Sequence, residues 1–144
     1  MSNTCKDMNT IDDVKIIEIP KIVDPRGNLS VIEKEVIPFK MKRVYYLYDV
    51  PCDSKRGGHS HINQQEFLIA LSGSFNVIVN DGVQKRTITL NKPNKGLLIT
   101  EGIWRELDDF SSGSVCLVLA SDEFLEEDYI RNFTDFIKQK DQFS

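Results

Sequence analysis

Short segments in which apolar and polar residues alternate run along most of the chain, and turn-forming residues separate them. A period of two, in segments rich in β-branched and aromatic residues, is typical of β-strands with one buried face. The Asp81–Gly82 pair lies between two such segments and is a strong hairpin signal. About eight short strands with tight turns predict an antiparallel sandwich or barrel. They fall in residues 14–20, 27–35, 42–50, 65–90 (three strands), 95–102 and 114–121.

The C-terminal segment, residues 122–139, departs from this pattern. Phe124, Tyr129, Phe133 and Phe136 recur there at spacings of three to five residues, with acidic residues first and lysines last. That order of charges matches the dipole of a helix. We therefore predict one or two short C-terminal helices.

Composition limits the functional classes. The 144 residues carry a net charge of -4, which argues against a nucleic-acid partner, because binding to phosphate backbones needs a basic surface. Residues 1–13 are polar and acidic, unlike a secretory signal, and no apolar run approaches the length of a membrane span. Cys5, Cys52 and Cys116 are odd in number and irregularly spaced, which favours reduced thiols. We expect one domain over residues 1–144, located in the cytoplasm, with no membrane partner.

Both histidines of the chain occur in the stretch RGGHSH, residues 56–61. On a strand, His59 and His61 would project from the same face, either into the barrel or out of it. Three interpretations are open: two solvated histidines, two ligands of a metal, or an acid–base pair that needs no metal.

The spacing of residues after these histidines resembles the first signature motif of the cupins, a family of small β-barrels. Four residues separate His61 from Glu66, and six more precede Gly73. The second cupin motif would supply another histidine, but TEGIWR has Arg105 at that position. A guanidinium cannot ligate a cation and instead attracts anions. Two histidines and one carboxylate could still form a facial triad for iron, so the metal interpretation stays open.

Arginines and tyrosines near these motifs are candidates for binding an anionic substrate. Arg56 precedes the histidines, and Arg26 lies in the turn DPRG. Arginine's forked donors suit phosphate oxygens. In VYYLY, alternation sends Tyr45 to one face and Tyr46 and Tyr48 to the other, and a buried tyrosine can transfer a proton.

A larger resemblance covers residues 16–136. The stretches DPRGNLSVIE, IPFKMKRVYYLY, RGGHSH, IWRELDDF and EEDYIRNFTDF occur in the order seen in the nucleotide-sugar 3,4-ketoisomerases, which are cupins. The resemblance implies an all-β fold: a cupin-type antiparallel barrel or jelly roll with a short C-terminal helix. It also implies metal-independent conversion of a dTDP-4-keto-6-deoxyhexose to its 3-keto isomer through an enediol, with no cofactor. Such a product feeds the synthesis of a 3-amino sugar of surface glycans.

The resemblance also implies roles for single residues. His61 is our first choice as the base at carbon, His59 is its partner or shuttle, and Tyr46 is a candidate proton donor. Arg26 and Arg56 would hold the diphosphate, and Arg105 would contact the substrate. Residues 62–67, INQQEF, differ from the family pattern; there we take Gln64 as the substrate contact. The family further implies a homodimer, often with exchanged N-terminal strands.

Three alternative functions remain open at this stage. A nucleotide-sugar 3,5-epimerase is a related barrel that would leave the ketone at carbon 4. A metal-dependent cupin oxygenase would need a bound cation. A non-catalytic sugar-binding module would keep the barrel without the chemistry. The configuration of the product at carbon 4 cannot be read from these residues.

Overall fold

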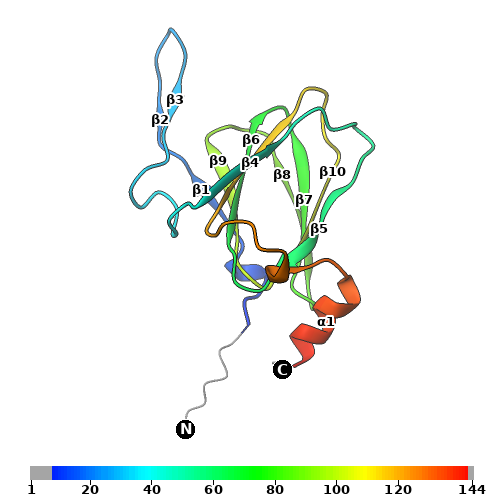
Figure 1. Ribbon diagram of the computed structural model, residues 1–144. Coiled ribbons are helices and arrows are strands. Elements are labelled where there is room, and N and C mark those ends of the chain that lie inside the picture. Colours follow the sequence, from blue (N-terminus) through cyan, green and yellow to red (C-terminus); the bar gives the residue numbers. More distant parts are fainter. Residues whose placement is uncertain (1–7, 143–144) are drawn as a thin grey trace.

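The computed structural model describes residues 8–142 as a sandwich of two five-stranded antiparallel sheets with one C-terminal helix (Figure 1). Cys5, the first residues of the polar N-terminal segment and residues 143–144 lie outside the described residues. All strand pairs are antiparallel. The prediction of an all-β fold with a short C-terminal helix is confirmed.

The first sheet has the strand order β1-β9-β6-β11-β4. Its strands are β1 (Lys15–Glu18), β9 (Lys95–Ile99), β6 (Glu66–Ser72), β11 (Val115–Ala120) and β4 (Arg43–Leu47). The second sheet has the order β12-β5-β10-β7-β8. Its strands are β12 (Tyr129–Ile130), β5 (Arg56–His61), β10 (Trp104–Asp108), β7 (Phe75–Asn80) and β8 (Lys85–Leu90).

The main core fills the space between the two sheets. Strand β7 shows how the sequence pattern builds it, because Phe75, Val77 and Val79 are buried while the residues between them are half-buried. From the other sheet, Leu68 and Cys116 reach the same core, as expected of a cysteine in an apolar strand. Burying each large apolar side chain contributes roughly 1.5–3 kcal/mol.

A second, smaller core lies on the outer face of the first sheet. Four apolar side chains point outward from the strands of this sheet: Phe67, Ile69, Leu98 and Leu119. Residues 32–39, in the loop between β3 and β4, cover them. Gly96 on β9 is required for this packing, because a Cβ there would lie 2.1 Å from the ring of Phe67. The loop itself corrects one prediction: of the expected strand 27–35, only β3 (Leu29–Ser30) forms.

Strands β2 (Lys21–Ile22) and β3 pair only with each other, in a two-stranded hairpin. Figure 1 shows this hairpin standing away from the two sheets. Its side chains include the exposed apolar residues Ile22, Val23 and Leu29. The short 3-10 helix η1 (Ile11–Asp13) precedes β1 and closes one end of the core with Ile11.

The C-terminal segment only partly follows the helical prediction. It forms the 3-10 helix η2 (Glu126–Asp128), then strand β12, then helix α1 (Phe133–Asp141), whose N-cap is Asn132. Phe133 and Phe136 of α1 pack against Trp104 of β10. The segment therefore wraps across the outer edge of β5. No helix in the described part of the chain is long and apolar enough to cross a membrane.

Candidate active site

The two histidines lie side by side on the inner face of β5. His59 and His61 are 6% and 4% exposed, so the interpretation as a solvated pair does not hold. Their Nε2 atoms are 3.1 Å apart, which is hydrogen-bond distance. Burial lowers the pKa of His59 to about 4, against the opposing effect of the Glu66 carboxylate, and this ring is therefore neutral at pH 7.

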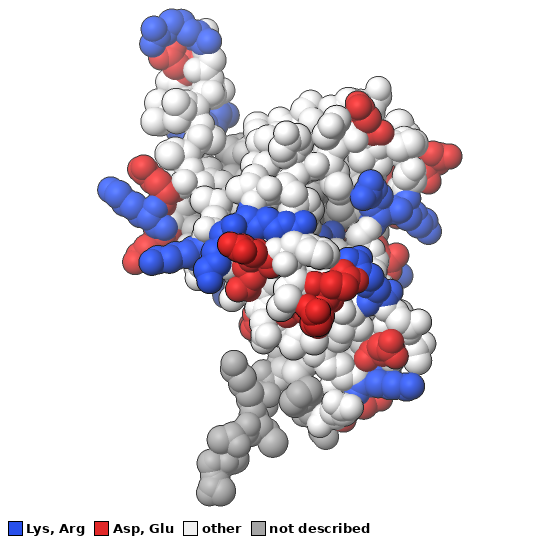
Figure 2. All heavy atoms as spheres, viewed as in Figure 1, with Lys and Arg blue, Asp and Glu red and all other residues white. Residues whose placement is uncertain are grey.

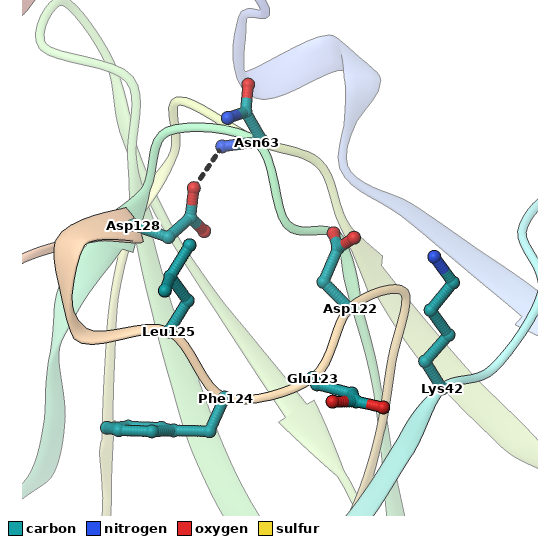
Figure 3. Close-up of a pocket in the computed structure, with 7 residues that line it drawn as sticks. All are labelled: Lys42, Asn63, Asp122, Glu123, Phe124, Leu125 and Asp128. Carbon is teal, nitrogen blue, oxygen red and sulfur yellow. Dashed lines mark hydrogen bonds between the residues drawn. The ribbon is translucent and has the colours of Figure 1, made fainter.

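The Nδ1 atom of His61 faces a carboxylate that lies 67 residues later in the chain. It lies 3.1 Å from Oδ2 of Asp128, the last residue of η2. The backbone N–H groups of Asn63 and Gln64 also donate to this carboxylate, at 2.8 and 3.1 Å. Figure 3 shows the Asn63 bond, with Asp128 forming part of the wall of a cavity of about 500 Å³. The carboxylate is thus held by main-chain donors against the imidazole.

Gln64 is the member of the INQQEF stretch that reaches the histidines. Its Nε2 lies 3.3 Å from Nε2 of His61, and the residue is buried. Gln65 instead donates its backbone N–H to Ser121 Oγ, at the edge of β6. Of Gln64, Gln65 and Glu66, therefore, Gln64 and Glu66 lie in the site.

Glu66 and Arg105 form a buried ion pair behind the histidines. Nε of Arg105 donates to Oε1 of Glu66 at 2.7 Å, and both side chains are at most 3% exposed. Tyr45 donates its hydroxyl to Oε2 of Glu66 at 2.6 Å and accepts from Nη2 of Arg105 at 2.9 Å. Burial alone would raise the pKa of Glu66, but the guanidinium holds it well below its usual value. Two of the N–H donors of Arg105 are therefore engaged by Glu66 and Tyr45. Its contact with the substrate stays a prediction.

His59, His61 and Glu66 lie close enough together to supply ligands to a single metal ion. One ligand atom from each can be chosen so that all lie within 4.8 Å of one another. However, both oxygens of the Glu66 carboxylate already accept hydrogen bonds, and the fixed charge of Arg105 lies beside them. A dication bound to Glu66 would lie beside this guanidinium and would be repelled by it. The donor set does not fit a cation site.

An aromatic and cationic rim borders the histidines. The ring of Tyr129 on β12 lies 4.9 Å from that of His59 and 4.4 Å from that of His61, between centroids. Arg43 of β4 donates to the Tyr129 hydroxyl at 3.1 Å, and its guanidinium lies over the ring of Tyr45. No carboxylate of residues 8–142 forms a salt bridge with Arg43. Its charge is free to attract an anion.

A β-bulge brings Arg56 onto the histidine face. Arg56 and His59 are three positions apart, so a regular strand would send them to opposite faces. The pairing with β10 shifts register between them: His59 opposes Arg105, whereas Arg56 opposes Leu107. Directly opposed residues share a face, so Arg56 projects on the side of His59. Gly57 makes this possible, since its φ is +79° and a Cβ would lie 2.5 Å from Nη1 of Arg105.

Two predicted site residues lie away from the histidines in the folded chain. Tyr46 is 60% exposed on the outer face of β4, next to Tyr48, whereas Tyr45 points inward. The alternation was predicted correctly, and it places Tyr46 on the face away from the histidines, so the geometry does not support its predicted role as proton donor within one chain. Arg26 lies in the turn of the β2–β3 hairpin and pairs with Asp24 at 2.9 Å. Within one chain, the β2–β3 hairpin stands away from β5, the strand of the histidines (Figure 1).

Three residues of this site were not singled out from the sequence. Asp128 and Tyr129 belong to a segment predicted to be helical, and Arg43 lies in a strand chosen for its tyrosines. The stretch EEDYIRN, which was part of the family resemblance, was the one available signal for Asp128 and Tyr129. The resemblance did not indicate which acidic residue of this stretch would face the histidines.

Comparison with known proteins gives consistent matches. A family model described as "FdtA: WxcM-like, C-terminal" matches residues 12–141. The TDP-4-oxo-6-deoxy-alpha-D-glucose-3,4-oxoisomerase of Aneurinibacillus thermoaerophilus is 45% identical over 125 residues, which are 86% of this chain and 90% of that protein. A 3,4-ketoisomerase from Helicobacter canadensis is 42% identical with a TM-score of 0.87, over 90% of this chain and 98% of that one.

The sugar 3,4-ketoisomerase QdtA from Thermoanaerobacterium thermosaccharolyticum is 40% identical. It superposes with a TM-score of 0.89 over 92% of this chain and 98% of its own, in a complex with TDP. One histidine-to-asparagine mutant of QdtA was crystallised with TDP-4-keto-6-deoxyglucose. An epimerase from Mycobacterium tuberculosis, at 16% identity and a TM-score of 0.74, shares the fold alone, over 84% of this chain and 69% of its own.

Proposed function

Because this chain belongs to the FdtA, WxcM-like family, we propose that it acts as an isomerase that converts a TDP-4-keto-6-deoxyhexose into the 3-keto isomer. The enzyme class follows from the relatives. They are 3,4-ketoisomerases, and their similarity to this protein extends over nearly the whole chain. The observation that carries the chemistry is the inward-facing pair of imidazoles, with Nε2 atoms 3.1 Å apart.

The reaction moves two protons and leaves the oxidation level of the sugar unchanged. A base removes the proton on carbon 3, which the adjacent carbon 4 ketone acidifies, and the carbonyl oxygen gains a proton to give an enediol. A proton then returns to carbon 4, while the hydroxyl on carbon 3 loses its own proton and becomes the ketone. Histidine suits such transfers at neutral pH. In this proposal His59 and His61 move the carbon-bound proton.

The oxygen protons need a second group, and Tyr129 replaces Tyr46 in the proposal. Its ring contacts both imidazoles, and its hydroxyl accepts from Arg43, so its own proton is free to be donated. Tyr45 is a poorer donor because its hydroxyl already donates to Glu66 and burial raises its pKa.

The TDP moiety needs positive charge outside the histidine pocket. Arg56 is exposed on the histidine face, and Arg43 lies at the rim over aromatic rings. Forked guanidinium donors match diphosphate oxygens and would place the sugar against the imidazoles. We propose these two arginines as the diphosphate contacts within one chain, with Gln64 beside the sugar.

A metal-free mechanism is part of the proposal, because the Glu66 carboxylate is occupied by Arg105 and Tyr45. We expect chelator-treated enzyme in D₂O to convert TDP-4-keto-6-deoxyglucose fully. In a proton NMR time course, the carbon 3 signal should disappear as a 3-keto product deuterated at carbon 4 forms. Exchange at carbons 3 and 5 with the ketone still at carbon 4 would indicate an epimerase. Turnover that appears only after a metal is added would contradict the metal-free mechanism.

We also propose that the enzyme is a homodimer. An isolated two-stranded hairpin is marginally stable in water, yet β2–β3 stands apart with Val23 77% exposed. The outer face of the edge strand β4 presents Val44 and Tyr46, and Tyr48 follows just after the strand; each is more than half exposed. Figure 2 shows a broad area without charged side chains on the upper body, where β4 lies. A second copy that pairs with the hairpin and this face would cover both, and would bring Arg26 to the partner's site.

The dimer predicts a solution mass of twice the 16.5 kDa of one chain, measured by light scattering. Replacing both Tyr46 and Tyr48 with glutamate should give the monomer mass, because two charges would be buried without partners. Val83→Glu is the control, since Val83 is 91% exposed in the β7–β8 loop, away from this face. A wild-type monomer would exclude the proposed interface.

The remaining parts of the proposal concern the cell. A ketone at carbon 3 is the group from which an aminotransferase can make a 3-amino sugar, and surface glycans are the expected destination. Cys52 and Cys116 are free thiols, which suits the reducing cytoplasm as the location.

A further inference from the structure

We propose that Asp128 is a positioning residue that determines which nitrogen of each histidine carries the proton, so that Nδ1 of His59 is left as the proton acceptor. The proposal rests on the proposed function, in which the two histidines move the carbon-bound proton. It is carried by the chain of contacts from Asp128 through His61 to His59, which are 3.1 Å each.

The first step concerns Nδ1 of His61. Three N–H groups converge on the Asp128 carboxylate: the backbone amides of Asn63 and Gln64, and the imidazole. A carboxylate only accepts hydrogen bonds, so the imidazole must donate. His61 therefore carries its proton on Nδ1, as a histidine does when a carboxylate orients it.

The second step transfers this constraint to the neighbouring ring. A neutral imidazole protonated on Nδ1 has its lone pair on Nε2. This atom faces the side-chain amide nitrogen of Gln64 at 3.3 Å, which can only donate, and Nε2 of His59 at 3.1 Å. Oε1 of Glu66 is farther away, at 3.5 Å, and already accepts from Arg105. To donate to the lone pair of His61, His59 carries its proton on Nε2, which leaves its own Nδ1 unprotonated.

The third step follows the proton after it leaves the sugar. His59 resists a charge, because burial lowers its pKa to about 4. It can pass its Nε2 proton to Nε2 of His61, which then becomes an imidazolium. That imidazolium would lie 3.1 Å from Asp128 and 3.5 Å from Oε1 of Glu66, with Arg105 on the far side of Glu66. Two carboxylates facing one imidazolium stabilise it.

The fold holds Asp128 in this place through the main chain. Tyr129 pairs with His61 across β12 and β5, and the Asp128 carbonyl accepts from the backbone N–H of Ile62 at 2.9 Å. Other acids of the segment have different partners. Asp122 accepts from the Ser121 hydroxyl, and Glu126 pairs with Arg131. Asp122→Asn is therefore a matched control in the same segment.

The test uses the fact that the chain has only two histidines, so a ¹⁵N-histidine-labelled sample shows these two rings alone. In the wild type at pH 7, we expect His61 to be protonated on Nδ1 and His59 on Nε2. In the wild type, Oδ1 of Asp128 accepts from Asn63, whereas Oδ2 accepts from Gln64 and faces His61. In Asp128→Asn, one of these oxygens becomes an N–H₂ group, so the side chain no longer presents only acceptors to Nδ1 of His61. The populations of both tautomers should shift toward the inverted form. We expect kcat to fall about 10²-fold with KM unchanged, the behaviour of a wrong tautomer rather than of lost binding.

Opposite tautomers in the wild type would overturn the proposal, and that spectrum needs no variant. Unchanged tautomers and kcat in folded Asp128→Asn would also overturn it. Asp122→Asn should match the wild type in both measurements. The tautomers are read without substrate, so a protein with the expected spectrum but no isomerase activity would retain this assignment and refute the proposed function.

Discussion

His59→Asn should abolish isomerisation while leaving nucleotide binding intact. The variant removes the unprotonated Nδ1 that we assign as the acceptor of the carbon 3 proton. His59 is 6% exposed, and asparagine keeps a polar side chain at this buried position. However, asparagine has no lone pair basic enough for this transfer. Positioned proton transfer contributes typically about 10²–10⁴-fold, and we expect kcat to fall by that amount. TDP affinity, measured by titration calorimetry, should change little, because Arg56 and Arg43 are untouched.

His61→Asn should also be inactive in turnover, as expected from the sequence, but the two variants should differ in a partial reaction. Exchange of the carbon 3 proton with D₂O requires only the base at carbon. We expect His59→Asn to lose this exchange and His61→Asn to retain part of it. The reverse result would return the base to His61, our first choice from the sequence. Near-wild-type turnover in both would refute the histidine assignment, and Tyr46→Phe, on the outer face, should stay fully active.

Arg105→Leu should have the largest effect on stability. It leaves the Glu66 carboxylate, 1% exposed, without the guanidinium that lies 2.7 Å away. Removing one partner of a buried pair costs roughly 3–5 kcal/mol in the free energy of unfolding, mainly from the uncompensated charge. Urea unfolding at one fixed protein concentration measures this value. Arg131→Leu, which breaks the exposed pair with Glu126, should change stability little and serves as the control.

The pH dependence of this loss has a definite sign. In the wild type, the pKa of Glu66 is held well below 4.5, so its pairing stabilises the fold at neutral pH and is lost as the pH falls through that lowered value. Without Arg105, burial raises the pKa of Glu66 and acid neutralises it. The stability difference between variant and wild type should therefore shrink on going from pH 7 toward pH 4. The double variant Glu66→Gln/Arg105→Leu should recover much of the loss, and a loss that is pH-independent would contradict the ion-pair explanation.

The strands and their faces were largely predictable because they depend on local periodicity. The alternation in residues 43–47 and 75–80 is a property of neighbouring residues, and the structure follows it. The same rule placed Tyr45 opposite to Tyr46. It failed where tertiary contacts compete with local preference. Ile32, within the expected strand 27–35, lies in a loop that covers the small outer core, and Tyr129 pairs with β5 as a strand within a segment of helical composition.

The site divides in the same way. By itself, the sequence determined that His59 and His61 share a face, since a period of two acts along a single strand, and the motif placed Glu66 and Arg105 among the site candidates. Only the tertiary structure decided that Arg105 pairs with Glu66, that a bulge at Gly57 brings the exposed Arg56 to the side of His59, and that Asp128 contacts His61, 67 residues away in the chain. These contacts depend on the register between strands and on the path of a loop. Because they join residues far apart in sequence, no local pattern encodes them.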